Sequence, residues 1–150
     1  MYIADGKTNG PAFSWPDGKR IAVMVTFDYD AEFLRISRAK SKGTSIGFTD
    51  FSRGQYGPHE GLARCLDMLD TMNIKSTFFV PGAVIETYRD TVEEIHRRGH
   101  ELACHGYRHE SDPELSRDEM IKILDKSEAL LAEITGKKPV GHRAPESVLQ

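Results

Sequence analysis

Two aspartates separated by a single residue, Asp28 and Asp30, follow an apolar stretch near the start of the chain. Neighbouring carboxylates repel each other unless a proton or a cation lies between them, and a divalent metal ion is a common solution. The structural alternative is that one carboxylate caps a turn or the segment that follows. The spacing on its own therefore leaves a metal site and a turn equally open.

Two histidines four residues apart, His105 and His109, form a second candidate group. From a helix face or a tight loop, this spacing can present two imidazoles to one metal ion. The chain contains six histidines, so the spacing could arise by chance, and we expect His96 and His100 to be structural or surface residues. Together with a nearby aspartate, however, two histidines complete a three-ligand set that leaves positions open for water and substrate.

An arginine lies in a third group, Gly141–Pro145, near the end of the chain. Arg143 could be an ordinary surface charge, but it could also hold one of the two aspartates by a bidentate ion pair. That arrangement would leave one aspartate for a metal ion and the other for base chemistry. Pro145 would stiffen the turn that carries the arginine.

Apolar runs and helical periodicity alternate along the chain, which predicts an α/β fold with a parallel sheet, open or closed into a barrel. The expected strands are residues 20–27, 74–80, 100–104 and 140–143, and the expected helices are residues 58–72, 83–98 and 116–136. Pro58 can open the first helix, and a capping box at Ser116 and Glu119 opens the last. Residues 31–57 are expected to be a long functional loop.

These elements explain how the three groups could meet. In parallel α/β folds, ligands bind at the carboxyl ends of the strands. The aspartates follow the first expected strand, the histidines follow the third, and Arg143 follows the fourth. The candidate chemistry is therefore expected to lie along one edge of the sheet.

The composition excludes several other classes of protein. The length suits one domain spanning residues 1–150, and the net charge of −3 argues against a nucleic-acid or anionic-lipid partner. No apolar run reaches the roughly 20 residues of a membrane span, and no signal-peptide pattern opens the chain, so we expect a cytoplasmic protein. Cys65 and Cys104 are expected to be small buried side chains rather than a disulfide.

Four motifs in order resemble those of the polysaccharide deacetylase family, the NodB-homology domain of carbohydrate esterase family four. The motifs are Thr26–Asp30, Ser76–Gly82, His100–His109 and Arg143–Pro145. The resemblance implies a distorted (β/α) barrel with fewer than eight strands, of which this chain would contain about the first half to two-thirds.

The resemblance also assigns roles within these motifs. Asp28 matches the general base, and Arg143 matches the residue that orients it. The metal ligands would be Asp30, His105 and His109, and the expected metal is zinc. Tyr107 and Pro145, from the third and fourth motifs, are expected to contact the substrate.

The resemblance leaves more than one substrate open. The family removes acetyl groups from N-acetylated sugars such as those of peptidoglycan or chitin, so a sugar polymer or its precursor is the leading expectation. Tyr29 separates the two aspartates, however, and this form is similar to a subgroup with peptidoglycan-deacetylase-like and allantoinase or cyclic-imidase-like members. The alternatives are therefore a hydrolase of a small cyclic amide or imide, and a catalytically incomplete fragment.

The later family motifs, a hydrophobic acetyl pocket and a Leu-His pair that supplies the general acid, are not found before Gln150. Half a barrel would expose the edges of its sheet. We therefore expect either a truncated product or a homo-oligomer in which a second copy completes the barrel.

Overall fold

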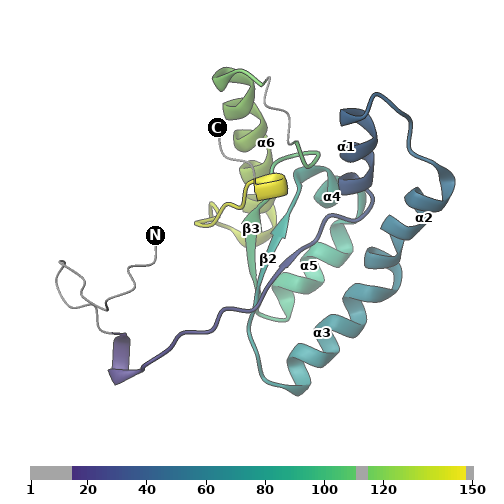
Figure 1. Cartoon of the computed structure of the whole chain (residues 1–150). Helices are drawn as coiled ribbons and strands as arrows, with labels where there is room; N and C mark the ends of the chain where they lie inside the picture. Colours follow the sequence, from purple (N-terminus) through teal and green to yellow (C-terminus); the bar gives the residue numbers. More distant parts are fainter. Residues whose placement is uncertain (1–14, 111–114, 148–150) are drawn as a thin grey trace, which may run out of the picture.

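The computed structural model describes residues 15–110 and 115–147, which form a three-stranded parallel sheet surrounded by helices (Figure 1). The strands are β1 (Thr26–Asp28), β2 (Thr77–Val80) and β3 (Glu101–Cys104), and they lie in the order β1-β2-β3. Phe27 pairs with Phe78, which in turn pairs with Leu102. Strands alternate with helices along the chain, so the predicted α/β class is confirmed.

In the part of the chain that the structure describes, six α-helices and three shorter helical turns connect and flank the strands. The α-helices are α1 (Phe33–Ser41), α2 (Phe48–Tyr56), α3 (Leu62–Thr71), α4 (Gly82–Thr87), α5 (Arg89–Arg97) and α6 (Arg117–Thr135). The shorter turns are η1 (Pro16–Gly18), η2 (Gly57–Gly61) and η3 (Pro145–Ser147). The predicted capping box is present at the start of α6, where Ser116 and Glu119 bond to each other's backbone N–H.

Two helices occupy most of the segment that was expected to be a loop, so that prediction for residues 31–57 is wrong. Helix α1 buries Phe33, and α2 packs so closely on the turn before α1 that a Cβ on Gly54 would lie 2.4 Å from Glu32 Cα. Pro58 does not begin a helix: it lies in η2, a π-helical turn that links α2 to α3 without interruption. Proline lacks an N–H group, and a single π turn accommodates that loss.

The predicted strand over residues 20–27 is also wrong in most of its length. β1 begins at Thr26, and the side chains before it are exposed: 75% for Ile21, 83% for Val23 and 87% for Met24. Figure 1 shows this segment running away from the sheet. Within the described residues, β1 pairs only with β2, so nothing there covers the apolar run.

The other strands and helices differ less from the expected boundaries. The second strand starts at Thr77 rather than at residue 74, and Tyr88 divides the expected helix 83–98 into α4 and α5. The expected strand 140–143 is reduced to a single bridge between His142 and Cys104. Two backbone hydrogen bonds, from Cys104 N to Gly141 O (2.9 Å) and from Arg143 N to Cys104 O (3.0 Å), still hold this segment beside β3.

The core lies between the sheet and the helices that follow its strands. Its most enclosed side chains are Phe78, Val80, Leu66, Leu69, Val84, Ile95 and Leu131. Cys104 is buried and Cys65 half-buried, and neither forms a disulfide. None of the described helices is long and apolar enough to cross a bilayer.

Candidate metal centre

The carboxyl ends of the strands surround a cavity of about 250 Å³. Its walls contain the aspartates that end β1, the two histidines that follow β3, and the arginine held beside β3. In Figure 1, α1 and η3 lie at this same end of the sheet. The lining residues are Asp28, Asp30, Leu34, Arg38, His105, His109, Arg143, Ala144, Glu146 and Ser147. The sequence-predicted residues Asp28, Asp30, His105, His109 and Arg143 therefore meet in one place.

Asp30, His105 and His109 form a compact donor group. One ligand atom from each of the three lies within 4.8 Å of the others. His105 Nε2 is 3.5 Å from Asp30 Oδ1, and His109 Nε2 is 3.8 Å from Asp30 Oδ2. Asp30 Oδ1 and His109 Nδ1 are buried without a hydrogen-bond partner. Because unpaired buried polar atoms are costly, and because two imidazoles with a carboxylate suit zinc, the residues fit a divalent cation.

The backbone of Arg143 fixes the orientation of one of these ligands. His105 Nδ1–H donates to the carbonyl oxygen of Arg143 at 2.7 Å, which leaves the lone pair of Nε2 facing Asp30. Such a bond to the non-ligating nitrogen selects the tautomer that can bind a metal. His109 has a left-handed backbone, with φ of 59°, and its carbonyl oxygen accepts a hydrogen bond from Ser37 of α1 at 2.7 Å.

Burial and charge determine the protonation of the donor group. Burial, together with the neighbouring Asp28 and Glu146 carboxylates, raises the pKa of Asp30 to about 7. Burial lowers the pKa of both His105 and His109. The imidazoles are therefore neutral near pH 7, as metal ligands must be, while Asp30 needs a nearby cation to stay ionised.

Asp28 lies beside this group and is held by Arg143. The guanidinium donates through one Nη to Asp28 Oδ1 and through the other to Thr26 Oγ1 at 2.8 Å. The expected bidentate pair with an aspartate is thus wrong, because Thr26 takes the second donor. The guanidinium carbon also lies 3.9 Å from the centre of the Phe79 ring. Arg143 is fixed by three groups and keeps Asp28 oriented at the cavity.

Two charged residues in the cavity wall, Arg38 and Glu146, were not predicted from the sequence. Arg38 of α1 donates to Glu146 of η3 at 2.5 and 3.0 Å, a pair that joins two sides of the cavity. The only sequence signal was the position of Glu146 directly after the Arg143–Pro145 motif.

Of the two expected substrate contacts, one lies next to the cavity and the other lies away from it. Tyr107 OH donates to Glu86 of α4 at 2.6 Å and accepts from Lys126 of α6 at 2.5 Å, outside the cavity lining. Pro145 is buried and lies in the turn between Ala144 and Glu146, which do line the cavity. The structure therefore places Pro145 next to the cavity and does not bring Tyr107 to it.

Comparisons with known proteins agree on one family. The family model described as polysaccharide deacetylase matches residues 16–149. A peptidoglycan deacetylase-like protein of Gibberella zeae is 35% identical over 129 residues, which cover 85% of this chain and 38% of that protein. The peptidoglycan deacetylase of Helicobacter pylori is 35% identical over 127 residues, covering 85% of this chain and 42% of that one.

Solved structures show the same likeness. A protein from Mycobacterium smegmatis described as a polysaccharide deacetylase matches 95% of this chain and 49% of its own, with a TM-score of 0.82 and 39% identity. An allantoinase matches 90% of this chain and 50% of its own with a TM-score of 0.77 at 22% identity, a likeness of fold alone. The chain thus spans half or less of the length of these proteins.

Proposed function

The chain belongs to the polysaccharide deacetylase family, and on that premise we propose that its site hydrolyses the acetamido group of an N-acetylated sugar in a glycan such as peptidoglycan. One observation carries the proposal: the Asp28–Arg143 pair and the Asp30, His105 and His109 donor group line the same cavity. Amide hydrolysis needs both a base for water and a stabiliser for the carbonyl oxygen, and these two groups supply them.

The donor group would hold the stabiliser. A divalent cation, which we propose is zinc, would be held by Asp30, His105 and His109 and would supply Lewis-acid polarisation of the amide carbonyl and activation of water. The protein's own part is to keep both imidazoles neutral and His105 in the correct tautomer, through burial and the Arg143 carbonyl.

Asp28 would act as the base. Arg143 donates to Asp28 Oδ1 and to Thr26 Oγ1, which holds the Asp28 carboxylate at the cavity, where it can accept a proton from the attacking water. The same proton can then pass from Asp28 to the departing amine nitrogen. Water and the acetamide are thereby converted to acetic acid and the free amine, and transfer of the acid's proton to the amine gives acetate and the ammonium form of the amino sugar.

The test is release of acetate from an N-acetylated glycan by the full chain loaded with zinc, compared with Asp28→Asn. We expect turnover in the wild type and almost none in the variant, with metal content unchanged in both. Lys137→Gln, on a distant surface, is the matched control. A wild type that binds metal but releases no acetate from any glycan would contradict the proposal.

Hydrolysis of a cyclic amide is the second candidate, because the allantoinase structure shares the fold over most of this chain. The same assay separates the two, with allantoin and a simple cyclic imide as added substrates. Ring opening of either without acetate release from glycans would replace the proposed function.

A further inference from the structure

A second cavity of about 300 Å³ lies beside the candidate metal centre. It is lined by one side of α1 and by the segment that leads from α1 into α2. Arg38 lines both this cavity and the one that contains the metal ligands. The two cavities are therefore neighbours that share the Arg38 side chain, so a ligand with several units could occupy both.

The second cavity is basic although the whole chain is acidic. Arg35, Arg38 and Lys42 line it, against a single carboxylate from Asp50. Asp50 pairs with Arg35 at 3.2 Å, and Arg38 is paired with Glu146. Counting both ion pairs still leaves the positive charge of Lys42, in a chain whose net charge is −3.

Helical geometry concentrates these cations. Arg35 and Arg38 lie three residues apart on one face of α1, and Lys42, the residue that follows the helix, lines the same cavity. Lys40, on the same helix, is exposed and does not line the cavity. The basic wall thus depends on which positions carry the charge and not only on how many charges α1 contains.

The end of the wall is held in place by its backbone. Helix α1 closes with hydrogen bonds from Gly43 N to Lys40 O (2.9 Å) and from Thr44 N to Ala39 O (3.0 Å). Gly43 adopts the left-handed conformation, φ of 66°, that this turn requires. Lys42 therefore projects from a fixed position next to the cavity.

We propose that this basic cavity is a subsite for a carboxylate carried by the substrate, on a sugar unit next to the one whose acetamido group enters the metal centre. The inference rests on the proposed function and adds a selectivity to it. Arginine and lysine donate charge-assisted hydrogen bonds to carboxylates, and a neutral glycan has no group to use them. The subsite would therefore favour glycans with acidic sugars over neutral ones.

The test compares two N-acetylated glycans of equal length, one neutral and one in which alternate sugars carry a free carboxylate. Binding to the metal-loaded full chain is measured by calorimetry in an Asp28→Asn background, and kcat/KM is measured with Asp28 intact. In Lys42→Gln we expect the Kd for the acidic glycan to rise about three- to tenfold, because one exposed charge is removed, and the Kd for the neutral glycan to stay the same. Lys40→Gln should change neither, and added salt should reduce the preference of the wild type.

The outcomes separate this inference from the proposed function. Hydrolysis of both glycans with equal efficiency, unaffected by Lys42→Gln, would keep the function and remove the subsite. Failure to bind or hydrolyse either glycan, in protein that holds metal, would remove both. A Lys42→Gln variant that weakens the two glycans equally would also overturn the subsite, since a carboxylate-specific contact affects only one of them.

Discussion

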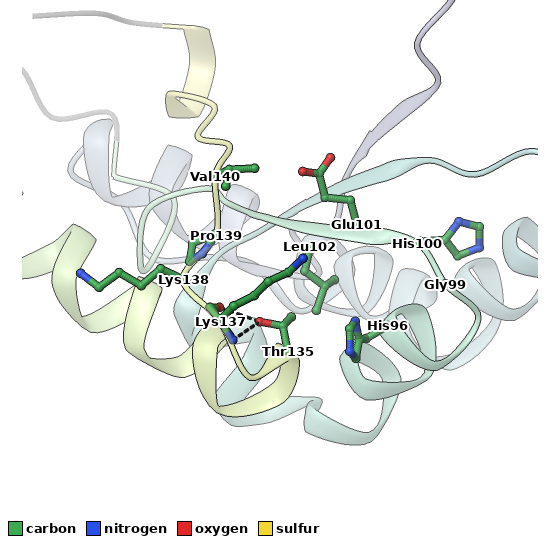
Figure 2. A pocket seen from close by; sticks show the side chains of 10 residues that line it. All are labelled: His96, Gly99, His100, Glu101, Leu102, Thr135, Lys137, Lys138, Pro139 and Val140. Carbon is green, nitrogen blue, oxygen red and sulfur yellow. Dashed lines mark hydrogen bonds between the residues drawn. The ribbon is translucent and has the colours of Figure 1, made fainter.

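Two histidine pairs with the same spacing lie at opposite ends of β3 and have different surroundings. His105 and His109 follow its carboxyl end, and His96 and His100 precede its amino end. Each pair borders a cavity, of about 250 Å³ at the carboxyl end and about 270 Å³ at the amino end. Figure 2 shows the amino-end cavity, with His96 on α5 and His100 just before β3. Cavity size and residue spacing therefore do not distinguish the two ends.

The backbone between the histidines makes the difference. Gly106 and His109 adopt left-handed conformations that fold the loop back, so the rings of His105 and His109 lie 5.0 Å apart and both face Asp30. At the other end, α5 stops at Arg97, and the left-handed Gly99 turns the chain into β3. A shared spacing produces a metal-type group only where a turn returns both rings to one acidic side chain.

His100 has a structural role instead. Its Nδ1 accepts a hydrogen bond from Ser76 N at 3.2 Å, and its ring packs edge-on against Phe78 at 5.4 Å between centroids. Only 3% of the residue is exposed, and burial lowers the pKa of its imidazole. The imidazole connects the starts of β2 and β3, which its position one residue before β3 makes possible.

Replacing histidines at the two ends of β3 should have its largest effect on metal binding. His105→Ala or His109→Ala should lower zinc affinity by more than about 100-fold, because even residues that only orient a ligand contribute 10- to 100-fold. Turnover should be lost with the metal. His96→Ala, the matched change at the other end, should keep one zinc per chain. Elemental analysis and competition with a chelator measure both, and equal loss in all three variants would remove the distinction between the two ends.

The next effect separates the two aspartates within the carboxyl-end cavity. Asp28→Asn should lower kcat by about 10²- to 10⁴-fold, the usual contribution of a general base, and leave zinc affinity within a few-fold of the wild type. Asp30→Asn should lower zinc affinity first. Steady-state kinetics with metal titration test the difference. If Asp28→Asn also released the metal, Asp28 would belong to the donor group.

The residues of the candidate metal centre could be predicted because parallel strands that alternate with helices end along one edge. Asp28 and Asp30 follow β1, and His105 and His109 follow β3, so topology alone brings them together. The contact between His105 and the Arg143 carbonyl could not be predicted, since it depends on one bridge beside β3 rather than on a strand.

The part of the cavity wall that α1 forms could not be predicted, because the composition of this segment suggested a loop. Helix α1 is rich in Ser, Lys and Arg and buries Phe33 alone, so its sequence resembles a solvated loop. Arg38 and the basic cavity became visible only when that segment proved helical. The apolar run before β1 led to the opposite error: it predicted a buried strand where the structure has exposed side chains. Burial of a strand depends on neighbouring strands, which a local sequence pattern does not show.

A smaller effect is expected on the pH dependence of stability in the metal-free protein. The pKa of Asp30 is about 7 in the folded chain, because burial and neighbouring carboxylates raise it from its ordinary 3.8. Well below pH 3.8 the carboxyl is protonated in both states. From about pH 3.8 to pH 7 it is ionised mainly in the unfolded state, so folding stability falls as pH rises. Asp30→Asn should remove this loss, which is at most about 4 kcal/mol for about three pKa units.

Denaturant unfolding of metal-free wild type and Asp30→Asn at pH 4 and pH 8 measures this difference. We expect the variant to gain stability relative to the wild type only at pH 8. Saturating zinc should remove the gain, because the cation stabilises the ionised carboxylate of the wild type. A constant difference between the two proteins at both pH values would show that Asp30 ionises normally.

The smallest effect tests the amino end. His100→Ala should lower the free energy of unfolding by about 2 kcal/mol, since it leaves the Ser76 N–H unpaired and a gap beside Phe78, and it should leave zinc stoichiometry unchanged. His96→Ala, an exposed position, should change stability by less than about 0.5 kcal/mol. His105→Ala is expected to lose zinc, whereas His100→Ala is expected to lose stability and keep its zinc. Zinc content and the free energy of unfolding should therefore distinguish the two histidines that flank β3. A zinc deficit in stable His100→Ala protein would mean that the amino end of β3 also positions the metal ligands.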